Sequence, residues 1–218
     1  MALNFYYGSG SPFAWRVWLA LEHKAIPYEF KVVSFSAGDT KKPEFLAMNP
    51  RHQVPVISDG NFSLYESAVI LEYLEEQYPS PDQAHALLPK DTRQRALARR
   101  LAREVDEYLT PGVSKLALQY WFTPEAERNP KHIANGRETF AKEMEFFEKE
   151  LRGDWLVGPL SLADFTLYPA VALLVRMEAK KDASLNVAAM LGPKLTAWRK
   201  RVEALPYFEK CTPPHWKT

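Results

Sequence analysis

The sequence has one cysteine, no long apolar run and almost no net charge. A single cysteine, Cys211, excludes an intramolecular disulfide, a Cys-x-x-Cys redox pair and a cysteine-rich zinc site. The five histidines include no pair at the spacing of helical metal ligands, so we expect no metal. The longest apolar run, residues 168–175, is far shorter than the roughly 20 residues that span a bilayer. We therefore expect no membrane segment and a cytoplasmic location.

Charge is balanced between 28 basic and 27 acidic side chains, giving a formal net charge of +1. The sequence has no basic stripe of the kind that nucleic-acid binding requires, so we expect no nucleic-acid partner. The 218 residues, 46% of them hydrophobic, are enough for one large globular domain or two small ones.

The sequence changes character near residue 80. Before it, short β-like runs alternate with amphipathic stretches, and after it nearly everything has helical periodicity. The segment 79–91 holds three prolines and no periodicity. We predict a first domain at 1–79, a linker at 80–90 and an all-helical second domain at 91–218.

The first domain is predicted to have the order βαβαββα, with strands at 3–7, 28–33, 54–57 and 62–65 and helices at 12–24, 42–48 and 66–78. The strand at 28–33 alternates in the manner of a half-buried strand, with Tyr28, Phe30 and Val32 on the buried side. This order is consistent with a mixed sheet flanked by helices, an α+β domain.

The second domain is predicted to contain helices at 92–108, 113–122, 130–151, 162–177 and 194–205. Pro111 and Gly112 are expected to interrupt the first of these runs. Ser161 and Asp164 match a capping box. Because the helix at 162–177 is apolar nearly all round, we expect it at the centre of the domain.

Three local features are candidates for chemistry. Ser11 follows a Gly-Ser-Gly loop and precedes Pro12, so a hydroxyl and free N–H groups lie together at a helix start. Such a helix start favours an anion. The alternative is that Ser11 only caps the helix. Pro55 lies within an apolar strand, which indicates either a cis Val54–Pro55 bond or an edge strand. Glu66 and Ser67 lie where a strand passes into a helix. Glu66 could bind an ammonium and Ser67 a carboxylate, or the acid at position 66 could only complement the helix dipole.

In this order and spacing, these features resemble the glutathione transferase family. The matching segments are Ser-Pro-Phe-Ala-Trp-Arg-Val at 11–17, Lys-Lys-Pro-Glu-Phe-Leu at 41–46, Asn-Pro-Arg-His-Gln-Val-Pro at 49–55, Glu-Ser at 66–67 and Gly-Pro-Leu-Ser-Leu-Ala-Asp-Phe at 158–165. The resemblance covers nearly the whole chain. It implies a thioredoxin-like first domain, followed by an all-α domain that contributes an electrophile pocket.

The resemblance also implies how glutathione binds. The main chain of Val54 would pair with the cysteinyl backbone, with Pro55 in cis, and Glu66 and Ser67 would hold the γ-glutamyl ammonium and carboxylate. Gln53 and Lys41 or Lys42 would contact the glycyl end. Thr40 stands where plant-type phi relatives often have a histidine.

Ser11 matches the catalytic serine of the serine-type classes, and its hydroxyl would stabilise the glutathione thiolate. Ser9, Tyr6 and Tyr7 are alternatives to Ser11. Glutathione would be a co-substrate, with no permanently bound cofactor. The second substrate would be a small hydrophobic electrophile, in a pocket whose candidate walls are Phe13, Tyr108, Trp121, Phe122, Phe165 and Tyr168.

The family also implies a homodimer, in which Asp106 would reach the partner's glutathione. The leading expected activity is conjugation of glutathione to the electrophile, which is a detoxification reaction. Peroxide reduction, dehalogenation and isomerisation on the same site are alternatives, as is a non-catalytic interaction module. The motifs mix phi, tau, theta and zeta features, so the class within the family stays open.

Overall fold

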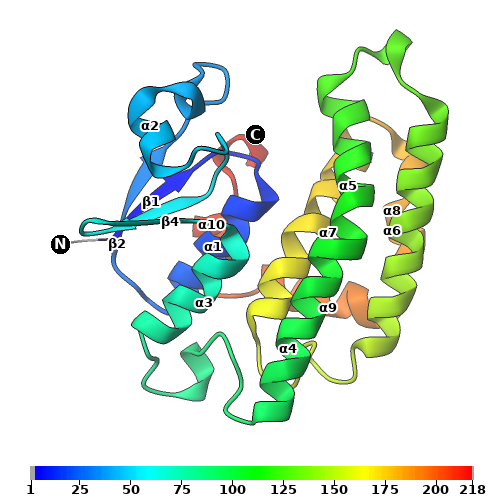
Figure 1. Cartoon of the computed structure of the whole chain (residues 1–218). Coiled ribbons are helices and arrows are strands. Elements are labelled where there is room, and N and C mark those ends of the chain that lie inside the picture. Colours follow the sequence, from blue (N-terminus) through cyan, green and yellow to red (C-terminus); the bar gives the residue numbers. More distant parts are fainter. Residues whose placement is uncertain (1–2, 218) are drawn as a thin grey trace. The chain divides into compact units, whose positions relative to one another are not determined.

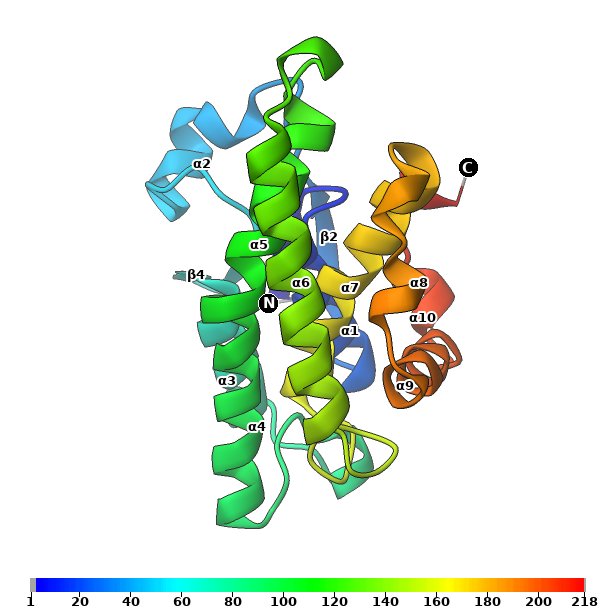
Figure 2. The same ribbon diagram turned by 90° about the vertical axis from the view of Figure 1, so that its right-hand side faces the viewer.

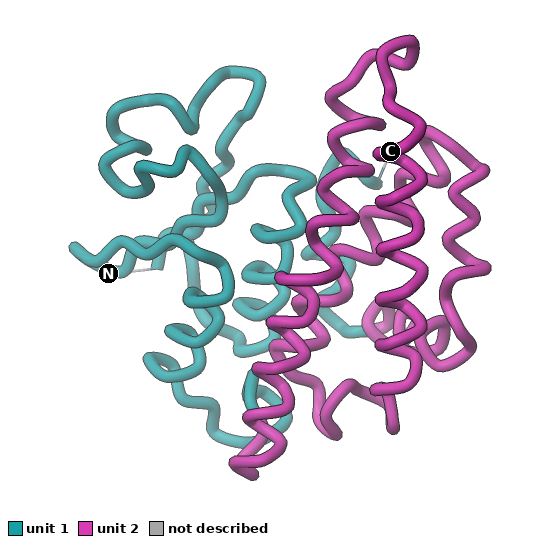
Figure 3. Tube along the Cα trace, turned by 45° about the vertical axis from the view of Figure 1, so that its right-hand side comes forward, with its two compact units in different colours: residues 1–88, 205–218 teal, residues 89–204 magenta. Residues whose placement is uncertain are grey.

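The protein is described here by a computed structural model of residues 3–217; residues 1, 2 and 218, which the predicted domain limits include, lie outside the described residues. The chain divides into two compact units (Figure 3). One unit comprises residues 1–88 together with 205–218, and the other comprises residues 89–204. Residues 205–218 therefore group with the first unit, an arrangement that helical periodicity alone does not reveal.

The first unit is built on a four-stranded mixed sheet (Figure 1). Its elements are β1 (Leu3–Tyr7), α1 (Pro12–His23), β2 (Tyr28–Val32), α2 (Pro43–Met48), β3 (Val56–Asp59), β4 (Phe62–Tyr65), α3 (Ser67–Gln77) and α10 (Phe208–Cys211). The strand order is β2-β1-β3-β4, with β1 and β2 parallel and the other neighbours antiparallel. The predicted order βαβαββα is confirmed.

Alternation along β1 places helices on both faces of this sheet. Leu3, Phe5 and Tyr7 are buried on one face, where the ring of Tyr7 lies 5.0 Å from that of Trp18 in α1. Tyr6 points to the other face, where its ring lies 6.3 Å from that of Phe45 in α2. Because α3 packs beside α1, these two helices cover one face and α2 covers the other.

Two strand predictions are corrected. Tyr28 and Phe30 in β2 pack their rings against Phe5 of β1, as predicted, but Val32 is 67% exposed. The strand β2 lies at the edge of the sheet, beside β1. The strand expected from residue 54 begins at Val56, after a cis Val54–Pro55 bond. Because β3 pairs with both β1 and β4, it is a central strand, and the edge-strand alternative for Pro55 is wrong.

The second unit is helical. Its helices are α4 (Thr92–Glu104), α5 (Thr110–Ala117), α6 (Pro130–Glu150), α7 (Leu162–Lys180), α8 (Val187–Met190) and α9 (Pro193–Glu203). The π-helical segments Val105–Leu109 and Leu118–Phe122 make the chain helical without a break from residue 92 to residue 122 (Figure 2). Among the described residues, no helix is long and apolar enough to cross a membrane.

The expected interruption at Pro111 and Gly112 is therefore wrong. A proline inside a helix removes one N–H and crowds the carbonyl four residues earlier. Here the π-helical turn ends just before it, with the Thr110 N–H bonded to the Val105 carbonyl, and this wider turn accommodates the ring. Gly112 permits close approach of α5 and α6, since a Cβ there would lie 3.3 Å from the Gly136 carbonyl oxygen.

The helix α7 forms the centre of the second unit, as its composition predicts, and is buried along nearly its whole length. The capping box of Ser161 and Asp164 is confirmed. The fully buried Asp164 carboxylate accepts hydrogen bonds from the Leu156 N–H at 3.1 Å, the Ser161 N–H at 2.9 Å and the Trp198 Nε1–H at 2.9 Å. Burial raises the pKa of Asp164 to about 6, and these hydrogen bonds oppose the rise.

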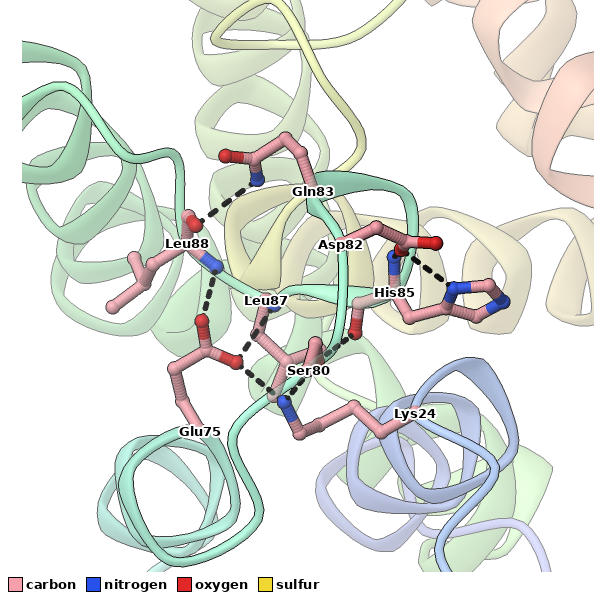
Figure 4. A network of polar contacts seen from close by, with 8 residues as sticks. All are labelled: Lys24, Glu75, Ser80, Asp82, Gln83, His85, Leu87 and Leu88. Atoms are coloured by element: carbon pink, nitrogen blue, oxygen red, sulfur yellow. Dashed lines mark hydrogen bonds and ion pairs between the residues drawn. The ribbon is translucent and has the colours of Figure 1, made fainter.

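A buried ion pair holds residues 80–88 against the first unit (Figure 4). The Lys24 ammonium donates to Glu75 and to the Ser80 hydroxyl, both at 2.7 Å. The Glu75 carboxylate also accepts from the N–H groups of Leu87 at 2.9 Å and Leu88 at 3.2 Å. The Lys24 side chain is only 1% exposed, so its charge depends on Glu75 for compensation.

We expect Glu75→Ala to destabilise the protein by about 3–5 kcal/mol, because it strands a buried ammonium and two N–H groups. The measurement is the free energy of unfolding in urea. Glu76→Ala is the matched control on the exposed side of the same helix, with an expected change within about 0.5 kcal/mol. Equal stabilities of the two variants would contradict a central role for this ion pair.

Candidate functional site

The loop between β1 and α1 is a hydrogen-bonded turn. The Ser11 N–H donates to the Gly8 carbonyl oxygen at 3.1 Å, and Gly10 has a φ of +88°, as in a type II turn. Ser11 then caps α1, since its Oγ accepts from the Ala14 N–H at 3.2 Å. This bond uses a lone pair of Ser11 Oγ and leaves its proton for donation at the positive end of the helix dipole.

The turn is packed on two sides by residues distant in sequence. A Cβ on Gly8 would lie 2.4 Å from the Phe35 ring and 2.8 Å from the Val54 side chain, so a larger residue there would require these side chains to shift. On the other side, Ser9 Oγ and His215 Nδ1 are 2.7 Å apart in a hydrogen bond whose donor depends on the histidine tautomer. The two serines thus differ, because Ser9 binds the C-terminal segment and Ser11 caps α1.

The two tyrosines proposed as alternatives lie on opposite faces of β1. Tyr7 is 1% exposed, and its hydroxyl lies beside the Ser9 side chain and the Gly10 backbone. Among the described residues, no partner forms a hydrogen bond of good geometry with this hydroxyl. Burial raises the pKa of Tyr7, which makes its proton harder to release. Tyr6 packs against Phe45 on the other face.

The segment before β3 is fixed by a buried asparagine. Asn49 is 2% exposed; its side-chain amide donates to the Gln53 carbonyl at 2.7 Å, and its oxygen accepts from the Arg51 N–H at 2.9 Å. The Gln53 side chain is exposed. The main chain of Val54 precedes the paired register of β3, which begins at Val56.

The two lysines proposed for the glycyl end are both exposed. Lys42 forms an ion pair with Asp39 at 2.7 Å, which raises the pKa of Lys42 and lowers the pKa of Asp39. Thr40, where some relatives have a histidine, is 7% exposed and so is turned inward. An anionic group at this place would meet Lys41 and Lys42, with Asp39 competing for Lys42.

The start of α3 is strained and lies over a cation. Glu66 has a φ of +71°, which a residue with a Cβ rarely adopts, and its side chain is exposed. The neighbouring Ser67 is 4% exposed, and its hydroxyl accepts from Nε of Arg16 at 2.9 Å and also from Nη2. Arg16 is itself 5% exposed, so a buried guanidinium lies beneath the helix N-terminus and favours an anion there.

The aromatic residues proposed for the electrophile pocket differ in exposure. Phe13 lies in the first turn of α1 in the first unit, with the Arg16 guanidinium 5.3 Å from its ring centre. In the second unit, Tyr108 and Phe122 are 58% and 77% exposed and lie in the two π-helical segments. The Lys181 ammonium lies 4.7 Å from the ring centre of Trp121.

Phe165 and Tyr168, the two candidates on α7, are buried. The Tyr168 hydroxyl donates to Glu203 at 3.2 Å, and its ring lies 6.1 Å from that of Trp198. Asp106 lies in the π-helical segment Val105–Leu109 of the second unit.

The sequence did not predict a place in this region for three residues: Arg16, Phe35 and His215. Arg16 was present in the matching Trp-Arg-Val segment, but only the fold places it beneath Ser67. Phe35 had no signal beyond an aromatic in a loop. His215 lies 206 positions from Ser9, so no local pattern links them.

These residues give one end of the sheet a defined chemical character. Hydroxyl and N–H groups lie at the starts of α1 and α3, and the buried Arg16 guanidinium lies beneath the start of α3. Such a surface suits an extended anionic ligand. Among residues 3–217, no group of three or more histidine, cysteine or acidic side chains could hold a metal ion.

Comparisons with known proteins identify the family of the chain. The model of the N-terminal domain of glutathione S-transferase matches residues 10–77, and that of its C-terminal domain matches residues 86–206. Glutathione S-transferase A of Pleuronectes platessa is 32% identical over 221 residues, covering 98% of this chain and 92% of that protein. A probable maleylacetoacetate isomerase of Vibrio cholerae is 31% identical over 219 residues, covering 98% and 96%.

A solved structure agrees as well. The crystal structure of a glutathione S-transferase from the Antarctic clam Laternula elliptica matches with a TM-score of 0.81 at 31% identity, covering 100% of this chain and 94% of that one. The chain belongs to the glutathione S-transferase family. Its enzyme class is glutathione S-transferase, and its fold is the thioredoxin-like and all-α pair of that family.

The strain at Glu66 gives a test that does not depend on the ligand. We expect Glu66→Gly to raise the free energy of unfolding by about 1 kcal/mol, because glycine adopts positive φ without steric cost. Glu66→Ala keeps the Cβ and should bring no such gain. Chemical denaturation of the three proteins measures the difference, and a glycine variant less stable than the alanine variant would contradict strain at this position.

Proposed function

We propose that the chain binds glutathione on its first unit and that Ser11 holds the thiol in its ionised form for attack on a hydrophobic electrophile. The observation that carries the proposal is the place of Ser11 at the N-terminus of α1, with its hydroxyl proton left over from the cap. A free thiol has a pKa of about 8.5, and a helix N-terminus lowers it. A hydrogen bond donated by Ser11 favours the thiolate further.

Other residues would hold the peptide. The Val54 main chain would pair with the cysteinyl backbone beside Pro55, and Glu66 and Ser67 would bind the γ-glutamyl ammonium and carboxylate. The buried Arg16 supports this, since it adds positive charge behind the carboxylate. Gln53, Lys41 and Lys42 would contact the glycyl carboxylate, and their exposure supports that role.

The electrophile would lie against the aromatic residues proposed above, among which Tyr108 and Phe122 are the most exposed. Phe13, Trp121, Phe165 and Tyr168 complete the proposed set. We further propose a cytoplasmic homodimer without a permanent cofactor, in which Asp106 approaches the glutathione of the partner subunit. These expectations follow the family and are tested by light scattering and by localisation of the full chain.

The decisive experiment is Ser11→Ala with a chlorinated nitroaromatic substrate. The thiolate sulfur forms a bond to the ring carbon, chloride leaves with the bonding electrons, and the thiol proton is lost to solvent. We expect kcat to fall about 100-fold, since one donor to the developing and reacting anion is removed. The dissociation constant of glutathione should change by less than about threefold, because the peptide contacts remain.

Ser63→Ala on the exposed part of β4 is the matched control and should leave kcat unchanged. Ser9→Ala, Tyr6→Phe and Tyr7→Phe test the alternatives. Unchanged turnover in Ser11→Ala, together with a large loss in one of these variants, would transfer the catalytic role. Absence of glutathione binding to the wild-type protein, measured by calorimetry, would favour a non-catalytic interaction module.

Isomerisation is the second candidate function, favoured by the 31% identity to a probable maleylacetoacetate isomerase. The same thiolate would add to a cis double bond, allow rotation about the resulting single bond, and leave again. Glutathione is regenerated in this cycle. Catalytic turnover of a maleyl substrate with substoichiometric glutathione would establish isomerisation, and activity only with stoichiometric glutathione would establish conjugation.

A further inference from the structure

The C-terminal segment of the chain, residues 205–217, folds back along α1 within the first unit. The Tyr207 hydroxyl and His23 Nδ1 are 2.8 Å apart, and the Lys210 ammonium lies 2.6 Å from the Glu22 carboxylate. Further along, the ring of Trp216 packs edge-on against that of Trp15 at 4.9 Å. The segment is thus attached at the end of α1 and again near its beginning.

The last of these contacts reaches the turn that precedes α1. His215 hydrogen-bonds Ser9 Oγ through Nδ1 at 2.7 Å. Its ring also covers Gly10, because a Cβ built there would lie 3.1 Å from Cε1 and 3.3 Å from Nε2 of His215. A side chain at position 10 would therefore crowd the imidazole.

The turn from Gly8 to Ser11 needs support at this corner. Its Gly8 end is wedged against Phe35 and Val54, and its Ser11 end is fixed by the first turn of α1. Ser9 lies at the outer corner, with the buried Tyr7 hydroxyl beside it and no good hydrogen bond from that hydroxyl to a described residue. The bond to His215 is the hydrogen bond that the structure gives the Ser9 side chain.

We propose that His215 is a positioning residue for Ser11. By binding Ser9 and covering Gly10, it holds the Gly8–Ser11 turn in the conformation that aims the Ser11 hydroxyl at the glutathione sulfur. The inference rests on the proposed function of Ser11. It also assigns Ser9 a supporting role, since its hydroxyl is engaged by the imidazole rather than by the thiol.

The test compares His215→Ala with His215→Asn, whose amide can take the place of Nδ1. We expect His215→Ala to raise the apparent pKa of enzyme-bound glutathione by about one pH unit and to lower kcat/KM about tenfold below that pKa. The pKa is read from the ultraviolet absorbance of the thiolate against pH and from the pH profile of kcat/KM. The dissociation constant of glutathione should stay within about twofold, and His215→Asn should restore most of the loss.

Ser9→Ala removes the other partner of the same hydrogen bond. It should give a shift in the same direction and no larger than that of His215→Ala, because the imidazole still covers Gly10. The double variant should show no shift beyond that of His215→Ala, because both substitutions remove the same bond. His132→Ala, an exposed histidine of α6 in the second unit, is the matched control and should titrate like the wild type. Thermal unfolding monitored for each variant verifies that it is folded.

Three results would overturn the inference. A folded His215→Ala variant with a wild-type thiol pKa and kcat/KM would show that the contact with Ser9 does not matter for the site. A loss in Ser9→Ala much larger than in His215→Ala would place Ser9 itself on the thiol. A wild-type protein that binds no glutathione would overturn the proposed function together with this inference. The first result leaves the proposed function standing, and the second leaves glutathione binding and conjugation standing but moves the role of Ser11 to Ser9.

Discussion

The hydrogen bond from the Ser11 N–H to the Gly8 carbonyl oxygen closes the turn on which the candidate site depends. It connects the end of β1 to the start of α1 within four residues, so the first N–H groups of the helix lie beyond the end of a central strand. The positive φ of Gly10 makes this reversal possible, and Pro12 cannot donate an N–H back into it. A longer connection would place the helix N-terminus away from the cis-proline segment and the start of α3.

Two glycines make the turn a meeting point for distant parts of the chain. Gly8 admits Phe35 and Val54 from the segments before α2 and β3, and Gly10 admits His215 from the C-terminus. Because neither glycine has a side chain, these distant residues pack directly against the backbone of the turn at both positions. The chemistry proposed for Ser11 therefore depends on contacts made by residues that never touch the reacting atoms.

Local rules recover much of this arrangement from the sequence. Pro12 after Ser11 predicts the capped helix, and Pro55 in an apolar run allows a cis bond, because each rests on one residue and its neighbours. The incorrect predictions concern features that depend on other parts of the structure. The π-helical turn before Pro111 absorbs the effect of the proline, and the edge position of β2 leaves Val32 exposed despite its apolar pattern. The contact between Ser9 and His215 spans 206 positions and has no local signature.

The serine N-caps of α1 and α7 show that the same capping residue can serve either structure or the proposed chemistry. At α7, Ser161 is buried, and its N–H and hydroxyl both donate to Asp164, at 2.9 and 3.0 Å, so the cap is fully used in holding the second unit together. At α1, position 14 holds Ala14, which offers no carboxylate to Ser11; the Ser11 oxygen accepts one N–H, and its proton stays available at a partly exposed helix end. An acid at position 14 that accepted from the Ser11 hydroxyl, as Asp164 does from the Ser161 hydroxyl, would consume the donor that a thiolate requires. The absence of an acid three residues after Ser11 is thus as much a part of the proposed site as the serine itself.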